Sequence, residues 1–150
     1  RTVVENIAYP LRVRGEAKNR TLAQAAKWAE IIGLGNALEQ NAEVLSGGEK
    51  QKLAVARALI VQPEVLFLDE PTANLDGKAT REIEGILLAA QADGVRILMA
   101  THHLGQARRL ASDIIFLYQG QVHERATAEA FFNTPKTPES KSFLSGDIVE

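Results

Sequence analysis

The chain has 150 residues, of which 45% are hydrophobic and 24% are charged, a composition typical of one globular domain with a sizeable core. The formal net charge is −2, so charge does not favour nucleic acid or an acidic membrane surface as a partner. The absence of cysteine excludes disulfides and thiolate metal sites, and no apolar run approaches the roughly 18 residues that a membrane-spanning helix needs.

Two helices are predicted in the first third of the chain. Thr2 and Glu5 form a capping-box pattern, so a short helix begins at Thr2 and is expected to be disturbed near Pro10. A longer helix follows from about residue 16, because apolar residues recur at helical spacing until Gly33, which is a typical helix stop.

The next helix is predicted to begin at a glycine pair. Ser46 and Glu49 form a second capping box in front of an apolar-periodic run. Gly47 and Gly48 leave the first turn without side chains, so a phosphate group could approach bare backbone N–H groups at the positive end of this helix.

An acidic pair follows the first predicted strand. Residues 65–68 are four apolar residues in a row, which predicts a strand buried on both faces. The strand delivers Asp69 and Glu70 at its carboxyl end, the edge at which open α/β sheets bind ligands. One carboxylate there would suit Mg²⁺, and the other would suit the orientation or deprotonation of water.

The second half alternates helices and strands. Asp76 is predicted to cap a helix that runs to about Ala92. A buried strand is then predicted to end before Thr101 and His102, and a helix follows over residues 104–111. A hairpin of residues 113–117 and 121–124 is predicted to turn at Gln119 and Gly120. A short helix over 127–132, a loop over 134–140 and a last turn at Phe143 and Leu144 are predicted after it.

Each of these features also has a purely structural interpretation. A serine-capped glycine pair is most often only a helix start, and an acidic pair after a strand is most often only a turn. A further observation is that no Gly-x-x-x-x-Gly-Lys-[Ser/Thr] phosphate loop occurs in the 150 residues.

Taken together and in this order, the motifs resemble the ATP-binding cassette (ABC) family. Residues 45–49 resemble the signature loop, 65–70 the Walker B strand, 73–76 the D-loop and 100–102 the H-loop. The resemblance implies an α/β fold, namely the C-terminal part of a P-loop NTPase core without its phosphate-loop strand and Q-loop. It also implies a helical subdomain with the signature helix over about residues 1–60 and a core of Walker B, D-loop, H-loop and C-terminal hairpin over about 61–150.

The resemblance implies roles for individual residues. Ser46, Gly47, Gly48 and Gln51 would contact the γ-phosphate of ATP held by a second subunit, and Asp76 would couple the two nucleotide sites. Asp69 would support Mg²⁺, Glu70 would polarise the attacking water, and His102 would contact the γ-phosphate. The parent protein would be an ATPase, whereas the chain alone is expected to be inactive without the phosphate loop.

The partners implied are a second ATPase subunit in a homodimer and a transmembrane permease, with no nucleic acid. The location implied is cytoplasmic, at the inner face of the cell membrane. Residues 6–11 are similar to importer cassettes, and residues 143–147 resemble cassettes of tungstate or molybdate importers. Two alternatives are the C-terminal lobe of a chromosome-maintenance or DNA-repair ATPase and a non-catalytic regulatory fragment.

Overall fold

The computed structural model describes residues 1–146 and divides into two compact units, Arg1–Ala100 and a second unit that begins at Thr101. In the described part of the first unit, the helices are α1 (Val3–Val13), α2 (Lys18–Ile31), α3 (Gly47–Leu59) and α4 (Gly77–Ala92). Two 3₁₀ turns, η1 (Gly35–Ala37) and η2 (Ala42–Val44), lead into α3. The strands β1 (Val65–Asp69) and β2 (Arg96–Ala100) pair in parallel, with Val65 opposite Arg96 and Asp69 opposite Ala100.

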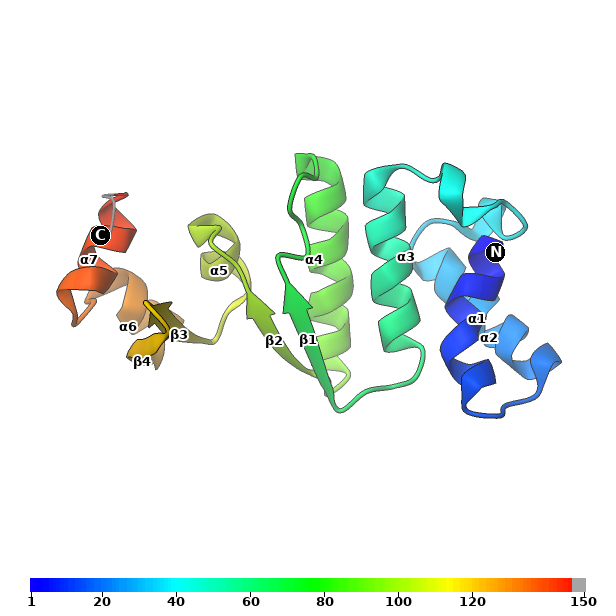
Figure 1. Cartoon of the computed structure of the whole chain (residues 1–150), viewed down its shortest axis with the longest axis horizontal. Coiled ribbons are helices and arrows are strands. Elements are labelled where there is room, and N and C mark those ends of the chain that lie inside the picture. Colours follow the sequence, from blue (N-terminus) through cyan, green and yellow to red (C-terminus); the bar gives the residue numbers. More distant parts are fainter. Residues whose placement is uncertain (147–150) are drawn as a thin grey trace. The chain divides into compact units, whose positions relative to one another are not determined.

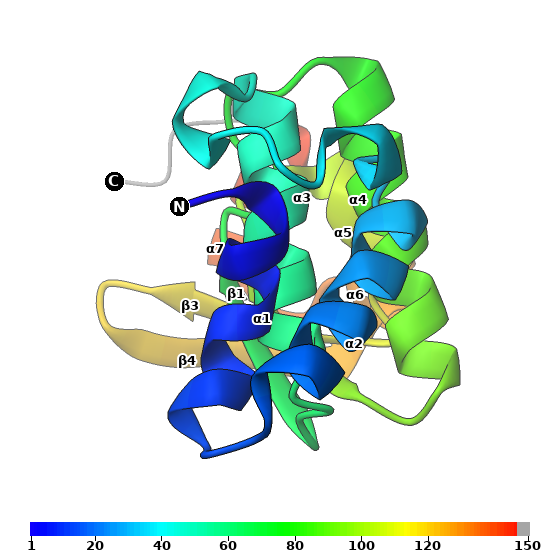
Figure 2. The same ribbon diagram turned by 90° about the vertical axis from the view of Figure 1, so that its right-hand side faces the viewer.

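Two apolar clusters hold the first unit together, and α3 contributes to both. One cluster joins α1, α2 and α3, and its fully buried members include Val3, Ile7 and Ala56. The other joins α3, α4 and β1, with Ile83 and Leu66 among its buried members. Figures 1 and 2 accordingly show α1 and α2 on one side of α3 and α4 on the other. Trp28 on α2 packs against both clusters, so this lone tryptophan serves packing within the unit.

Pro10 disturbs α1 less than its position predicts. The helix continues to Val13, and Arg14 N still donates to Pro10 O at 3.3 Å. Proline removes the hydrogen bond of its own nitrogen and crowds the carbonyl group four residues earlier. The burial of Leu11 in the first cluster nevertheless holds the last turn in place.

The prediction that residues 65–68 are buried on both faces is wrong for the described structure. Leu66 is buried, whereas Val65 and Phe67 are 38% and 75% exposed. The reason is that α3 and α4 cover one face of the two-stranded sheet, where Ile97 and Met99 also pack. Leu98 shares the opposite, exposed face with Val65 and Phe67.

The described part of the second unit contains α5 (Leu104–Leu110), β3 (Asp113–Tyr118), β4 (Gln121–Thr127), α6 (Ala128–Asn133) and α7 (Pro138–Ser145). The strands pair antiparallel, with an irregularity between Phe116 and Leu117. Gln119 and Gly120 both have positive φ (47° and 75°), which suits the two-residue turn predicted for the hairpin. The Phe116 ring lies 5.8 Å from Phe131 and 5.2 Å from Phe143, so these aromatic rings form the centre of the unit.

The C-terminal loop prediction over residues 134–140 is partly wrong, because α7 begins at Pro138. Thr137 caps this helix through a hydrogen bond from Ser140 N, and proline is accepted in the first helical turn. Of the importer-like stretch 143–147, residue 147 lies outside the described residues. No described helix is long and apolar enough to cross a membrane.

Candidate functional site

The first turn of α3 presents the predicted signature loop. Ser46 N donates to Glu49 Oε2 at 2.8 Å, Ser46 Oγ lies 2.7 Å from the same oxygen, and Glu49 N donates to Ser46 Oγ at 3.3 Å. The capping box predicted from the sequence is therefore confirmed. These hydrogen bonds from Ser46 lower the pKa of Glu49, so the carboxylate is ionised at neutral pH.

The exposed Ser46 and Gly47 lie at the positive end of a 13-residue helix. Helix geometry leaves the first N–H groups of α3 without intrahelical acceptors. Gln51 lies one turn further along α3 and is partly exposed.

A second capped helix start lies beside the first. Asp76 Oδ1 accepts hydrogen bonds from Lys78 N at 2.9 Å and from Ala79 N at 2.8 Å, which confirms Asp76 as the cap of α4. The backbone hydrogen bond from Ala79 is the largest cause of the lowered pKa of Asp76. A Cβ atom at Gly48 would lie 2.9 Å from the Cβ of Ala79, so glycine at this position allows the two helix starts to touch.

The acidic pair lies at the carboxyl end of β1. Asp69 is exposed and Glu70 is partly exposed. Glu70 N donates to Ala100 O at 2.9 Å, which extends the pairing of the two strands by one residue. Glu70 has a φ of 43° and Asn74 a φ of 61°, so both non-glycine residues adopt the left-handed conformation. Such backbone strain is often found at functional sites.

Seven of the eight predicted site residues belong to the first unit. Figure 1 shows that α3 and α4 begin at the end of this unit where β1 and β2 finish. The structure therefore places the following residues at one end of the unit: Ser46, Gly47, Gly48, Gln51, Asp69, Glu70 and Asp76.

The eighth predicted site residue, His102, belongs to the second unit. Its side chain is exposed, and its ring centroid lies 4.3 Å from that of His103. The backbone N–H of His103 donates to Thr101 Oγ1 at 3.1 Å, so the turn after β2 is held by a local hydrogen bond.

Sequence reasoning missed one charged pair next to the site, Lys52 on α3 and Glu82 on α4, whose Nζ and Oε2 atoms lie 2.8 Å apart. Lys52 follows Gly48 by four residues and Glu82 follows Ala79 by three, so each lies on the same helix face as the earlier residue. This spacing is visible in the sequence, but it does not show which faces of the two helices meet.

Comparison with known proteins shows what this architecture is. A solved ATP-binding cassette of an ABC transporter, the ADP conformation of MJ1267, superposes with a TM-score of 0.80 at 22% identity, over 97% of this chain and 63% of that one. The chain has the ATP-binding cassette fold. This confirms the predicted α/β fold class of the P-loop NTPases.

Sequence similarity to ABC transporter proteins also extends along nearly the whole chain. The ABC transporter family model matches residues 1–73. The phosphate import ATP-binding protein PstB 2 of Natronomonas pharaonis is 38% identical, over 99% of this chain and 55% of that protein. The methionine import protein MetN of Latilactobacillus sakei is 37% identical, over 99% of this chain and 44% of that protein. The histidine/lysine/arginine/ornithine transport protein HisP of Escherichia coli is 35% identical, over 98% and 58%. The chain thus spans about half the length of the curated relatives it matches.

Proposed function

We propose that this chain is part of the ATP-binding subunit of an ABC importer, which couples ATP hydrolysis to solute uptake. The observation that carries the proposal is the juxtaposition of the capped signature turn with the Asp76 turn, at the end of the unit where β1 presents its acidic pair. The similarity to proteins named for phosphate import and methionine import supports the importer class.

Each site residue has a role in this proposal. The Ser46 hydroxyl, the first-turn N–H groups at Gly47 and Gly48, and Gln51 contact the γ-phosphate of ATP held by a second, identical subunit. Asp76 links this contact to the adjoining site through the turn that it caps. His102 supplies a further γ-phosphate contact.

Asp69 and Glu70 have different roles in the proposed ATP hydrolysis. Asp69 offers an exposed carboxylate at the end of a strand, a hard oxygen ligand that fits Mg²⁺. When bound, Mg²⁺ supplies neutralisation of the charge on the phosphates. Glu70 orients and polarises the attacking water, and its left-handed backbone directs its side chain differently from that of the preceding strand residues.

The chain by itself is proposed to be inactive. Its sequence contains no Gly-x-x-x-x-Gly-Lys-[Ser/Thr] loop, and phosphoryl transfer relies on the lysine and backbone N–H groups of such a loop to hold the phosphates. The signature turn supplies only part of the γ-phosphate contacts.

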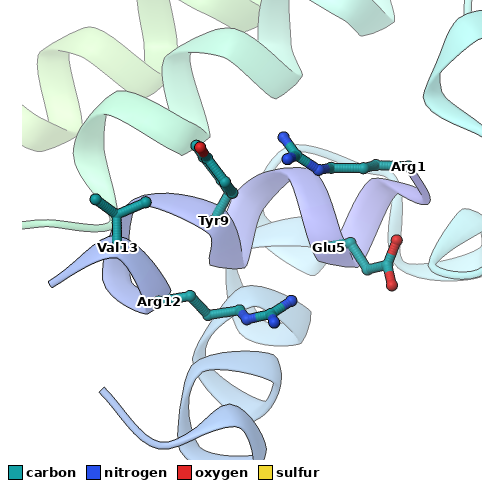
Figure 3. A pocket seen from close by; sticks show the side chains of 5 residues that line it. All are labelled: Arg1, Glu5, Tyr9, Arg12 and Val13. Atoms are coloured by element: carbon teal, nitrogen blue, oxygen red, sulfur yellow. The ribbon is translucent and has the colours of Figure 1, made fainter. Parts of the chain in front are cut away.

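The permease is proposed to bind the α1–α2 surface at the cytoplasmic face of the membrane. Figure 3 shows side chains of α1, together with Arg1 just before it, around a pocket on this surface. Its lining residues are Arg1, Glu5, Tyr9, Arg12 and Val13. Arg1 stacks over the Tyr9 ring at 4.1 Å, and Val13 is 68% exposed, so the surface offers both charged and apolar contacts.

The transported substrate is proposed to be a small solute and, more specifically, an oxyanion. The similarity of residues 143–147 to tungstate and molybdate cassettes supports the oxyanion, and one of the similar proteins is named for phosphate import.

Replacement of Glu70 by Gln in the full-length subunit tests the proposed chemistry. The amide cannot accept a proton from water, so we expect the steady-state ATPase rate to fall by roughly 10²–10⁴-fold while Mg-ATP binding persists. Glu64→Gln is a matched control, since Glu64 is exposed just before the same strand. An unchanged ATPase rate in Glu70→Gln would show that Glu70 is not the base.

A further inference from the structure

A charged pair crosses the interface between α3 and α4. Lys52 Nζ lies 2.8 Å from Glu82 Oε2, and the two side chains are 12% and 38% exposed. The hydrogen bond from Lys52 is the largest cause of the lowered pKa of Glu82. Lys78 also approaches Glu82, but at 3.9 Å and with a side chain that is 84% exposed, so its contribution is screened by solvent.

The Lys52–Glu82 pair lies one helical turn beyond the capped first turns of α3 and α4. Gly48 meets Ala79 at the top of the interface, and Lys52 meets Glu82 one turn further along each helix. Below them, Val55 and Ile83 belong to the same apolar cluster. The two helices therefore run in the same direction with their first turns at the same level (Figure 1).

Lys52 also lies near the end of α2. Its Nζ atom is 3.8 Å from the position that a Cβ at Gly33 would occupy, and Gly33 directly follows the C-cap of α2. A cation near a helix C-terminus is favoured by the partial negative charge of the last carbonyl groups. One ammonium group therefore lies where α2, α3 and α4 come together.

The ion pair is a directional contact between α3 and α4. The Gly48–Ala79 contact has no side-chain atoms on the glycine side, and apolar packing is tolerant of direction. A charge-assisted hydrogen bond is shorter and stronger than a neutral one, and it holds only while its two groups stay within bonding distance. Sliding of α3 along α4 by a full turn, about 5.4 Å, would separate the two groups.

We infer that Lys52 and Glu82 are positioning residues that hold the turn of Ser46–Gly48 in register with the turn of Asp76–Ala79. The inference rests on the proposed function, because it makes the phosphate contact at Ser46 and the coupling turn at Asp76 move as one body. Neither charged side chain needs to touch the nucleotide.

The first test is kinetic and uses the full-length subunit. Lys52→Met keeps the apolar stem and removes the charge, so we expect kcat for ATP hydrolysis to fall about tenfold with a smaller change in KM, since a misplaced group slows the reaction more than it weakens binding. Lys52→Arg should restore most of the rate. The control is Lys50→Met, an exposed lysine on the same helix, which should leave kcat unchanged.

A double-mutant cycle separates positioning from general stability. If Lys52 acts through Ser46, Lys52→Met has little further effect on kcat in a Ser46→Ala background. If the two substitutions instead lower kcat by independent factors that multiply in the double variant, the inference is overturned. If Ser46→Ala alone leaves ATP hydrolysis unchanged, the proposed function fails, and the positioning claim is then decided by the exchange measurement that follows.

Amide hydrogen exchange on the 150-residue chain supplies that measurement. The Glu49 and Ala79 amides each donate to the cap of their own helix, at Ser46 and Asp76 respectively. We expect Lys52→Met to accelerate exchange at both amides together, and the swap of Lys52→Glu with Glu82→Lys to reverse part of this change. Unchanged exchange at both amides would overturn the inference.

Discussion

At the scale of single residues, two site residues, Ser46 and Asp76, use their side chains to satisfy nearby backbone groups. Ser46 and Asp76 cap helices, and Glu49 completes the capping box at Ser46. Ser46 is also proposed to meet phosphate, and Asp76 is proposed to couple the two sites. Their structural task therefore fixes them in place before any ligand arrives, which reduces the ordering cost of binding.

Removal of the Ser46 cap should destabilise the chain. Ser46→Ala leaves Glu49 N without its side-chain acceptor, so we expect the free energy of unfolding to fall by about 1 kcal/mol. Ser46→Gly should cost only a few tenths of a kcal/mol, because glycine is itself an accepted cap. Urea unfolding followed by circular dichroism measures both values, and equal losses would contradict the capping role.

The same cap predicts a dependence on pH. Since the pKa of Glu49 is lowered in the folded chain from its ordinary value of 4.5, its contribution to stability is present above that value. It is lost as the pH falls through the lowered pKa. The stability difference between wild type and Glu49→Gln should therefore shrink below about pH 4.5. The exposed Glu39→Gln is the control.

At the scale of elements, a buried carboxylate ties β4 to the start of α7. Glu124 is 5% exposed and accepts hydrogen bonds from Lys136 N at 3.0 Å and from Thr137 N at 3.4 Å. Burial acts to raise the pKa of Glu124, but the hydrogen bonds from the Ser140 side chain and from these two backbone groups lower it overall. This anchor explains why a helix forms where the sequence alone predicted a loop.

Loss of that anchor should loosen the end of the second unit. Glu124→Ala leaves two backbone N–H groups without their acceptor, so we expect a loss of about 2 kcal/mol in unfolding free energy and faster amide exchange in α7. Arg125→Ala, at the exposed next position of β4, is the matched control. A similar effect from both variants would indicate that Glu124 has no special role.

At the scale of the molecule, the parallel pair β1–β2 has an uncovered apolar face. Phe67 is 75% exposed, Leu98 49% and Val65 38%. Parallel sheets are normally covered on both faces, and an exposed apolar strand pair is a template for association. Within the described residues, each of these strands pairs only with the other.

The 150-residue chain is therefore expected to self-associate through this face. Phe67→Ser should lower the mass measured by light scattering at a given concentration, because it removes the exposed aromatic ring of the β1–β2 sheet. Ile31→Ser is the control, since Ile31 is 61% exposed but lies on α2. A monomeric wild-type chain at all concentrations would contradict the prediction.

The sequence by itself determined the features that depend on local chemistry. The caps at Thr2, Ser46 and Asp76 and the turn at Gln119 and Gly120 each lie within a few residues of the groups that they satisfy, so the order of residues specifies them. The motif order likewise led to the correct fold class.

Only the tertiary structure decided which surfaces meet. The contact of Gly48 with Ala79 and the pairing of Lys52 with Glu82 span about 30 residues of chain, and helical periodicity gives the face of each helix but not its partner. The tertiary structure also decided that one face of β1 is exposed and that Glu124 anchors α7. An apolar run in a sequence does not show which part of the chain covers it. Burial and long-range pairing are properties of the packed chain.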